Sequence, residues 1–182
     1  MEYIDLATLE KGFDIIKQSP SKQGSLELIV TRPKVNQREE LTKGVLDEDQ
    51  GLVGDNWATR GSSSTSNGSA NPEMQINIMN SRVARLICQH HSDWKMAGDQ
   101  LFVDLNLSKD NVPPGTRLVV GKAILEVTSP PHTGCQKFAQ RFGRDALKFI
   151  STKEGRHWQL RGINAKVIKG GTVRLGDKVV KI

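Results

Sequence analysis

Short apolar runs, each closed by glycine or proline, fill the second half of the chain and restrict the folds open to it. Apolar and β-branched runs of this length, bounded by such breakers, predict β-strands. They lie at residues 101–107, 117–120, 123–128, 162–168, 172–175 and 178–182. Gly176-Asp177 predicts a hairpin between the last two runs. Many short strands and few long helices indicate a mainly β protein, a β-barrel or a sandwich, with a few short decorating helices.

The first half predicts two helices and two strands. Residues 3–18 have apolar side chains near helical spacing before Pro20, so we assign residues 1–20 to an accessory N-terminal helix and 21–182 to one domain. Residues 26–31 and 74–79 predict strands, the second half-buried. Ser81 is the expected cap of a helix reaching His90. Cys88 lies in that helix among apolar neighbours, which predicts an inert core thiol.

One low-complexity segment interrupts this pattern. Residues 61–71 read GSSSTSNGSAN, with Ala70 as the single apolar side chain. So polar a segment buries too little surface to offset the entropy lost on ordering. We predict a flexible Ser/Gly-rich loop inserted within the domain.

The cysteine content and the hydropathy of the sequence indicate the cellular compartment in which the protein works. A chain of 182 residues can bury a core without covalent help, and two cysteines do not make a disulfide framework. No basic n-region and apolar h-region open the sequence, and no apolar run approaches the roughly 18–20 residues that span a bilayer. We expect a cytoplasmic protein without a membrane partner.

The positive charge is concentrated after Cys135. The net charge is +6, and residues 136–161 contain seven Lys or Arg against Asp145 and Glu154. A basic balance is compatible with nucleic acid, a membrane surface or a phosphorylated small molecule. Two interpretations remain open for this stretch, a solvated helix face and an anion site beside the thiol.

The segment around Cys135 is where we expect any chemistry. Residues 130–143 read PPHTGCQKFAQRFG, and Thr133 with Gln136 has the spacing of a capping box. With Thr133 as N-cap, Cys135 would lie in the first helical turn, where unpaired N–H groups favour a thiolate. His132 and Lys137 add positive charge nearby. The alternative is a small residue selected for packing at a helix start.

Other common catalytic signatures are missing from the sequence. There is no HExxH, CxxC, Walker A or GxGxxG, and the four histidines lack zinc-ligand spacing with the two cysteines.

Four segments together resemble a known family. They are GLVGD (51–55), AGDQLFV (97–103), PPGTRLVVGKAILEVTSPPHTGCQKF (113–138) and RGINAKVIKGGTVRLGDKV (161–179). Their order, the length of the chain and the cysteine after a strand resemble the MOSC domain, the molybdenum cofactor sulfurase C-terminal domain, as a stand-alone member. The resemblance spans about residues 26–182. It implies a closed β-barrel similar to the barrel domain of pyruvate kinase.

The resemblance also implies a function. The matching Cys135 would be a molybdenum ligand, a sulfur carrier, or the catalytic residue of an oxidoreductase that reduces N-hydroxylated compounds. The expected cofactor is the molybdenum cofactor (molybdopterin), a phosphate-bearing pterin dithiolene, and pyridoxal phosphate binding is a further family association. Expected partners are a small-molecule substrate, with a cysteine desulfurase or an electron-donor protein. The candidate cofactor-binding residues are Arg60, His132, Thr133, Lys137, Arg141 and Arg161.

A second function class remains open. A basic β-barrel can bind nucleic acid without catalysis. However, aromatic residues form only 5% of the chain, and Trp57, Trp94 and Trp158 are scattered rather than grouped as a stacking platform. We therefore expect nucleic acid to be the less favoured partner.

Overall fold

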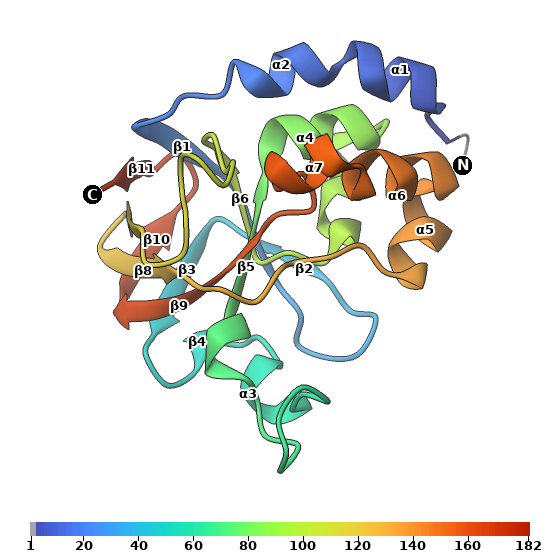
Figure 1. Ribbon diagram of the computed structural model, residues 1–182. Coiled ribbons are helices and arrows are strands. Elements are labelled where there is room, and N and C mark those ends of the chain that lie inside the picture. The colour runs from blue at the N-terminus through green and yellow to red at the C-terminus, as the bar shows by residue number, and fades with distance from the viewer. Residues whose placement is uncertain (1–2) are drawn as a thin grey trace.

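The computed structural model describes residues 3–182 and has a closed β-barrel at its centre (Figure 1). Neighbouring strands follow the order β11-β7-β8-β9-β5-β6-β1, and β1 pairs with β11 to close the ring. These strands are β1 (Gln23–Thr31), β5 (Ile76–Asn80), β6 (Leu101–Asp104), β7 (Arg117–Val120), β8 (Ala123–Val127), β9 (Ile163–Lys169) and β11 (Lys178–Lys181). The predicted mainly β fold with a closed barrel is confirmed.

One pair of barrel strands is parallel. β5 runs parallel to β6, while the other neighbours in the ring are antiparallel. A parallel pair needs a long crossover. Here the crossover holds α4 (Ser81–Ile87) and the 3-10 helix η2 (His91–Ala97), which lie against the outside of the barrel.

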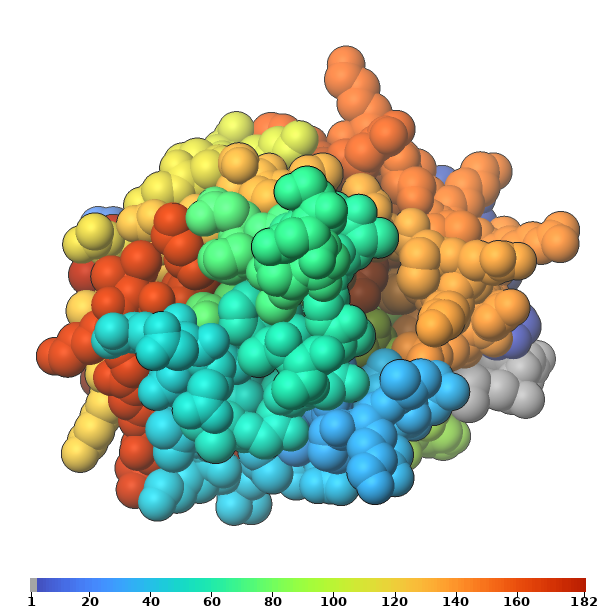
Figure 2. Space-filling view, turned by 90° about the horizontal axis from the view of Figure 1, so that it is seen from below, coloured from blue at the N-terminus to red at the C-terminus, as the bar shows by residue number. Residues whose placement is uncertain are grey.

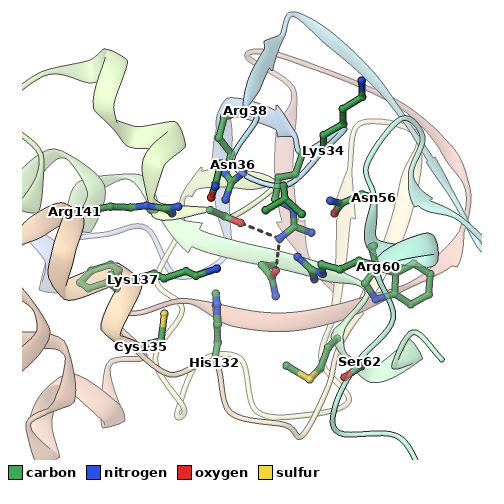
Figure 3. A pocket seen from close by; sticks show the side chains of 18 of the residues that line it. Lys34, Asn36, Arg38, Asn56, Arg60, Ser62, His132, Cys135, Lys137 and Arg141 are labelled. Carbon is green, nitrogen blue, oxygen red and sulfur yellow. Dashed lines mark hydrogen bonds between the residues drawn. The ribbon is translucent and has the colours of Figure 1, made fainter. Parts of the chain in front are cut away.

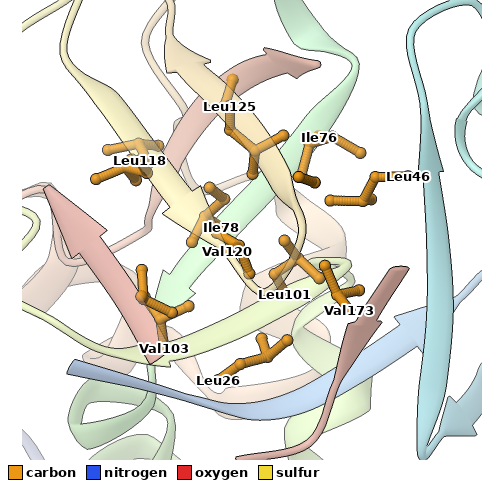
Figure 4. Close-up of a cluster of buried hydrophobic side chains, with 14 of the residues drawn as sticks. Leu26, Leu46, Ile76, Ile78, Leu101, Val103, Leu118, Val120, Leu125 and Val173 are labelled. Carbon is orange, nitrogen blue, oxygen red and sulfur yellow. The ribbon is translucent and has the colours of Figure 1, made fainter. Parts of the chain in front are cut away.

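The barrel is filled by aliphatic side chains that point inward from every strand (Figure 4). Leu26, Ile78, Leu101 and Leu118 are fully buried there. Each such side chain contributes about 1.5–3 kcal/mol through burial. This interior is therefore a packed core.

A second apolar cluster joins the outer face of the barrel to the helices. Met79 and Phe102, the neighbours of Ile78 and Leu101, point outward into it and are fully buried. β5 is consequently buried on both faces, so the strand predicted at residues 74–79 is confirmed but its predicted half-buried character is wrong. The helices that contribute side chains to this cluster are α1 (Leu6–Lys11), α2 (Phe13–Lys17), α4, η2, α5 (Gln136–Phe142) and α6 (Arg144–Ser151). The short helix α7 (Lys153–His157) packs beside α6.

The N-terminal helix is divided. The predicted helix over residues 3–18 is α1 and α2, which meet at Gly12. A Cβ at this position would lie 2.3 Å from Leu86 Cδ1, so the glycine allows a close approach to α4 without displacing the Leu86 side chain. Leu9, Phe13 and Ile16 are buried in the outer cluster.

A small second sheet flanks the barrel. It contains β10 (Gly171–Arg174), β3 (Lys43–Asp47) and β4 (Gly51–Leu52), and β2 (Glu39–Leu41) extends the barrel sheet beside β1. β10 pairs with β3, whereas β11 pairs with β7 and β1. The predicted hairpin between the last two strands is therefore wrong. Gly176, at φ +83°, turns the chain from one sheet to the other.

Two details of α4 also differ from the prediction. The N-cap is Asn80, whose Oδ1 accepts from Arg82 N at 2.7 Å, and the helix ends at Ile87 before reaching His90. Cys88 is buried as expected, and that burial raises the pKa of its thiol to about 12. None of the helices in residues 3–182 combines the length and the apolar character that crossing a bilayer requires.

Candidate anion-binding cavity

A cationic cavity of about 380 Å³ opens beside the end of β1. Figure 2 shows the hollow, between the orange atoms around α5, the teal atoms of the 61–71 loop and the blue atoms of the loop that follows β1. We call it the main cavity. Its lining, drawn wholly from the described residues, includes no Asp or Glu. The seven Lys and Arg residues that line it are Arg32, Lys34, Arg38, Arg60, Lys137, Arg141 and Arg161.

Arg32 is a fixed charge in the floor of this cavity. Its Nε and Nη2 donate to Asp55 Oδ2 and Oδ1 at 2.8 and 2.9 Å, and its Nη1 donates to Asn77 Oδ1 and Gly98 O. The Arg32 side chain is 5% exposed and that of Asp55 is fully buried. This bidentate pair joins the end of β1 to the segment before α3 (Trp57–Arg60).

Arg161 is the second fixed cation, and it is paired with Asp99. Its Nη1 lies 2.7 Å from Asp99 Oδ2, and its Nη2 donates to Ala97 O at 3.0 Å. Asp99 is fully buried, and burial raises the pKa of its carboxyl group while Arg161 acts in the opposite direction. Arg161 Nε is buried without a hydrogen-bond partner, so one donor of this guanidinium is unused.

His132 lies beside this pair. Its Nδ1 is 3.3 Å from Asp99 Oδ1, but the geometry is not that of a hydrogen bond, and both atoms lack one. Burial, with the charges of Arg161 and Arg32, lowers the pKa of His132 well below its ordinary value. The imidazole is consequently neutral near pH 7.

The other five cations have no carboxylate partner anywhere in residues 3–182. Burial and the charge of Arg32 lower the pKa of Arg60, and burial with the charges of Arg141 and Arg32 lowers the pKa of Arg38. Burial is the main cause of both pKa shifts, and repulsion among like charges adds to it. In Figure 3, Lys137, Arg141, Arg38 and Arg60 point toward one shared space. An anion in that space would relieve the repulsion.

Cys135 places an exposed thiol at the rim of the main cavity. The predicted capping box is wrong, because α5 begins at Gln136 and Cys135 itself is the N-cap, without a side-chain cap bond. Residues 131–135 remain irregular instead of helical. Gly134 of this segment packs closely against α6, since a Cβ there would lie 2.5 Å from Leu147 Cδ1.

The structure brings most of the candidate residues together. Arg60, His132, Cys135, Lys137, Arg141 and Arg161 all line the main cavity, from segments up to 101 residues apart. Thr133 does not; it faces a separate cavity on the other side of its segment.

Sequence reasoning missed Arg32, Lys34, Arg38 and Asn56 as site residues. The available signal was the cluster of basic residues, Arg32, Lys34 and Arg38, directly after the strand predicted at residues 26–31. Asn56 also lines the cavity, and its Oδ1 is buried without a partner.

The Ser/Gly-rich loop contributes to one wall. Gly61, Ser62 and Asn71 line the main cavity. Within the loop, Thr65 Oγ1 donates to Ser62 O and Ser69 O at 3.0 and 2.6 Å, so the loop is hydrogen-bonded to itself. Its predicted flexibility remains a prediction.

A resident metal ion would need ligands from outside this set. No group of three or more His, Cys, Asp or Glu side chains in the described part of the chain is arranged to hold a metal. The main cavity offers one thiol and seven cationic side chains.

The fold and the site define a β-barrel protein with a cationic cavity and a thiol at its rim. A family model, described as MOSC domain, matches residues 69–180, and the chain belongs to this family. The YuaD protein from Bacillus subtilis has a similar structure, with a TM-score of 0.60 and 16% identity over 87% of this chain and 95% of that chain.

Two further solved structures have the same fold. YiiM from Geobacillus stearothermophilus gives a TM-score of 0.54 at 16% identity, covering 87% of this chain and 73% of that chain. YiiM from Escherichia coli gives 0.54 at 17% identity, covering 87% and 69%. No curated protein sequence matches the chain significantly.

Proposed function

We propose that the main cavity binds the molybdenum cofactor, with the Cys135 sulfur as the protein's ligand to molybdenum. The observation that carries this proposal is an exposed thiol on the rim of a cavity lined by seven cationic side chains and no acidic one. The cofactor has a phosphate, a polar pterin and a soft metal, so it requires cations, hydrogen-bonding groups and a thiolate. Membership of the MOSC family supports the same assignment.

The residues present fit this cofactor. Arg38 and Arg60 have no carboxylate partner in the described residues, and a guanidinium can hold phosphate through two parallel hydrogen bonds. The unpartnered Asn56 Oδ1 and Arg161 Nε supply an acceptor and a donor for a polar ring system. When bound, the cofactor would supply two-electron redox chemistry beside Cys135.

For the reaction, we propose the reduction of an N-hydroxylated compound. Two electrons and two protons cleave the N–O bond, giving the amine and one water molecule. The protein's own share is to bind and orient: cations hold the anionic groups, and the neutral His132 contributes a hydrogen-bonding imidazole without adding charge. An electron-donor protein would provide the electrons. In the sulfur-carrier variant of the proposal, a cysteine desulfurase would instead transfer sulfur to Cys135 as a persulfide.

The test is molybdenum and pterin per chain in protein made in a host that synthesises the cofactor. We expect both in the wild type and neither in Cys135→Ser, which is close in size at an exposed position and should change stability by about 1 kcal/mol or less. Lys122→Ala is the control, because Lys122 is exposed and lies outside the main cavity.

Two outcomes would contradict the proposal. Full metal in Cys135→Ser would make the thiol dispensable. Wild type without molybdenum, but with persulfide on Cys135 after incubation with a desulfurase, would favour the sulfur carrier. Pyridoxal phosphate binding would be recognised by its own absorbance in the same samples.

Nucleic-acid binding is the competing function. The aromatic side chains that line the cavity, Trp57 and Phe138, are only 7% and 2% exposed, so neither offers a face for base stacking. Salt-sensitive binding of oligonucleotides that survives loss of the cavity cations would support this alternative.

A further inference from the structure

A second cavity of about 200 Å³ lies behind the segment that leads to Cys135. His132 and Arg161 line both this second cavity and the main cavity, so the two share a wall. Thr133 and Gly134 belong to the second cavity, whereas Cys135 belongs to the main one. Adjacent residues of one short segment therefore face two different spaces.

Three cationic side chains line the second cavity, and no acidic side chain of the described residues does. Lys109, Arg156 and Arg161 line it, and the lining, which falls wholly within residues 3–182, has no Asp or Glu. Arg161 is paired with Asp99, but Lys109 and Arg156 are exposed and have no ion pair among the described residues.

The acids that adjoin these two cations in the sequence are engaged elsewhere. Asp110, next to Lys109, lies 3.1 Å from His157 Nε2. Glu154, two residues before Arg156, lies 3.6 Å from Lys17 Nζ. Neither carboxylate lines the second cavity.

The rest of the lining combines apolar surface and backbone with the polar side chains of His132, Thr133, Ser151 and Gln159. Ile150 and Pro131 provide apolar surface, and Gly134, Gly155 and Gly162 leave backbone without side chains in front of it. The volume is below the range of roughly 300–1,000 Å³ typical for drug-sized ligands. A matching occupant has a small apolar body and one negative group.

We propose that the second cavity binds a small organic anion, an apolar carboxylate of about benzoate size. Its carboxylate would pair with Arg156 and Lys109, and its apolar part would rest on Ile150 and Pro131. Such an occupant contacts His132, Thr133 and Gly134 from behind, so it would also alter the reactivity of the Cys135 thiol. This site does not depend on the cofactor assignment.

Glycine amides provide a direct test by ¹H–¹⁵N NMR of the purified chain without cofactor. Gly134, Gly155 and Gly162 line the second cavity, while Gly61 and Gly98 line the main one. On titration with sodium benzoate, we expect saturable shifts of the first three amides at lower concentration than any shift of the last two. Acetate should bind at least severalfold more weakly, because it lacks the apolar body.

Substitutions of single cations distinguish benzoate binding in the second cavity from attraction to the net charge of the protein. Arg156→Gln and Lys109→Gln should each weaken benzoate binding about tenfold, since each removes one charge-assisted contact. Lys148→Gln is the matched control, an exposed cation of α6 that lines neither cavity. Melting curves of all three should coincide with that of the wild type, because these side chains have no ion pair to lose.

Three results would overturn the proposal. The first is the absence of saturable shifts at any soluble benzoate concentration. The second is shifts led by Gly61 and Gly98, which would place the anion in the main cavity. The third is equal weakening by Lys148→Gln, which would reduce the effect to net charge.

Discussion

His132 Nδ1 lies 3.3 Å from Asp99 Oδ1 in the wall between the two cavities, and neither atom has a hydrogen bond. The imidazole is held neutral there by burial and by two guanidinium groups, because protonation would add a third positive charge to a desolvated site. This arrangement links the ionisation of His132 to the stability of the fold.

We predict that stability falls on acidification below about pH 6.5 and that His132 contributes to the fall. The pKa of His132 is lowered in the folded state from an ordinary value of 6.5, so the unfolded state binds this proton first. Its contribution is complete above pH 6.5 and is lost between that pH and the lowered pKa, by up to about 1.4 kcal/mol per pH unit. Urea unfolding at several pH values should show a flatter dependence for His132→Asn. Equal slopes would contradict the prediction.

The two cysteines should differ sharply in reactivity. The pKa of Cys88 is raised from 9.0 to about 12, so its thiolate fraction near neutral pH is about a thousandfold below that of an ordinary thiol. Cys135 is exposed. Iodoacetamide should label Cys135 in the folded protein and Cys88 only after unfolding, as peptide mass spectrometry would show. Similar labelling rates for both thiols in the native protein would refute this expectation.

Breaking the pair between Arg32 and Asp55 should be costly. Asp55→Asn leaves the guanidinium of Arg32 buried without a counter-ion, and the loss of one partner of such a pair costs about 3–5 kcal/mol. The control is Asp14→Asn, which breaks an exposed pair with Lys17 and should cost about 0.5 kcal/mol or less. Chemical denaturation measures both. A cost for Asp55→Asn as small as that of the control would show that Arg32 is hydrated.

The uncompensated cations should contribute to cofactor retention one contact at a time. Arg60→Gln and Arg141→Gln each remove one charge from the main cavity, so each should weaken retention by about tenfold without abolishing it. The measurement is molybdenum per chain after extensive dialysis, with Lys122→Ala beside them. Arg161→Gln would be less informative, because it also strips Asp99 of its partner. Unchanged retention in both main-cavity variants would exclude these cations as anchors.

The 61–71 loop should be the first site of proteolysis in cofactor-free protein. Its hydrogen bonds from Thr65 and between Ser62 and Ser64 run within the loop, so they do not fasten it to the barrel. Because Ser62 also lines the main cavity, a bound anion should slow cleavage. Limited digestion with and without cofactor tests this. A resistant loop in the free protein would show that the internal bonds suffice.

The strands could be predicted from the sequence because glycine and proline residues mark their ends. The alternation of apolar and polar residues indicates which face of a strand is buried. The predicted run at 117–120 coincides with β7, and the run at 123–128 differs from β8 by one residue. The pairing of the strands could not be predicted from the sequence. β10 and β11 are separated by a turn typical of a hairpin, yet they belong to different sheets because β3 and β7, far away in sequence, compete for them.

Only part of the candidate site, like only part of the fold, could be predicted from the sequence. Charge and cysteine position identified the segment 132–141 and Arg161, because their chemistry is visible residue by residue. The capping box is not formed, because Cys135 rather than Thr133 caps α5, and the close packing of Gly134 against Leu147 and Ile150 is a tertiary contact that no local pattern reports. The pairs that turn Arg32 and Arg161 into fixed charges involve Asp55 and Asp99, 23 and 62 residues away, and no local pattern reports them.

The ring of strands is closed by β1 against β11, with Gln23 opposite Val180. During synthesis on the ribosome, β1 emerges long before its partner exists, so its edge stays open until residues 178–181 have been made. The nascent barrel therefore presents an unpaired strand edge for most of translation, a state that favours mispairing between neighbouring chains. Arg32 lies at the opposite end of β1 and is held by Asp55, Asn77 and Gly98, so this part of the floor of the main cavity does not have to wait for β11.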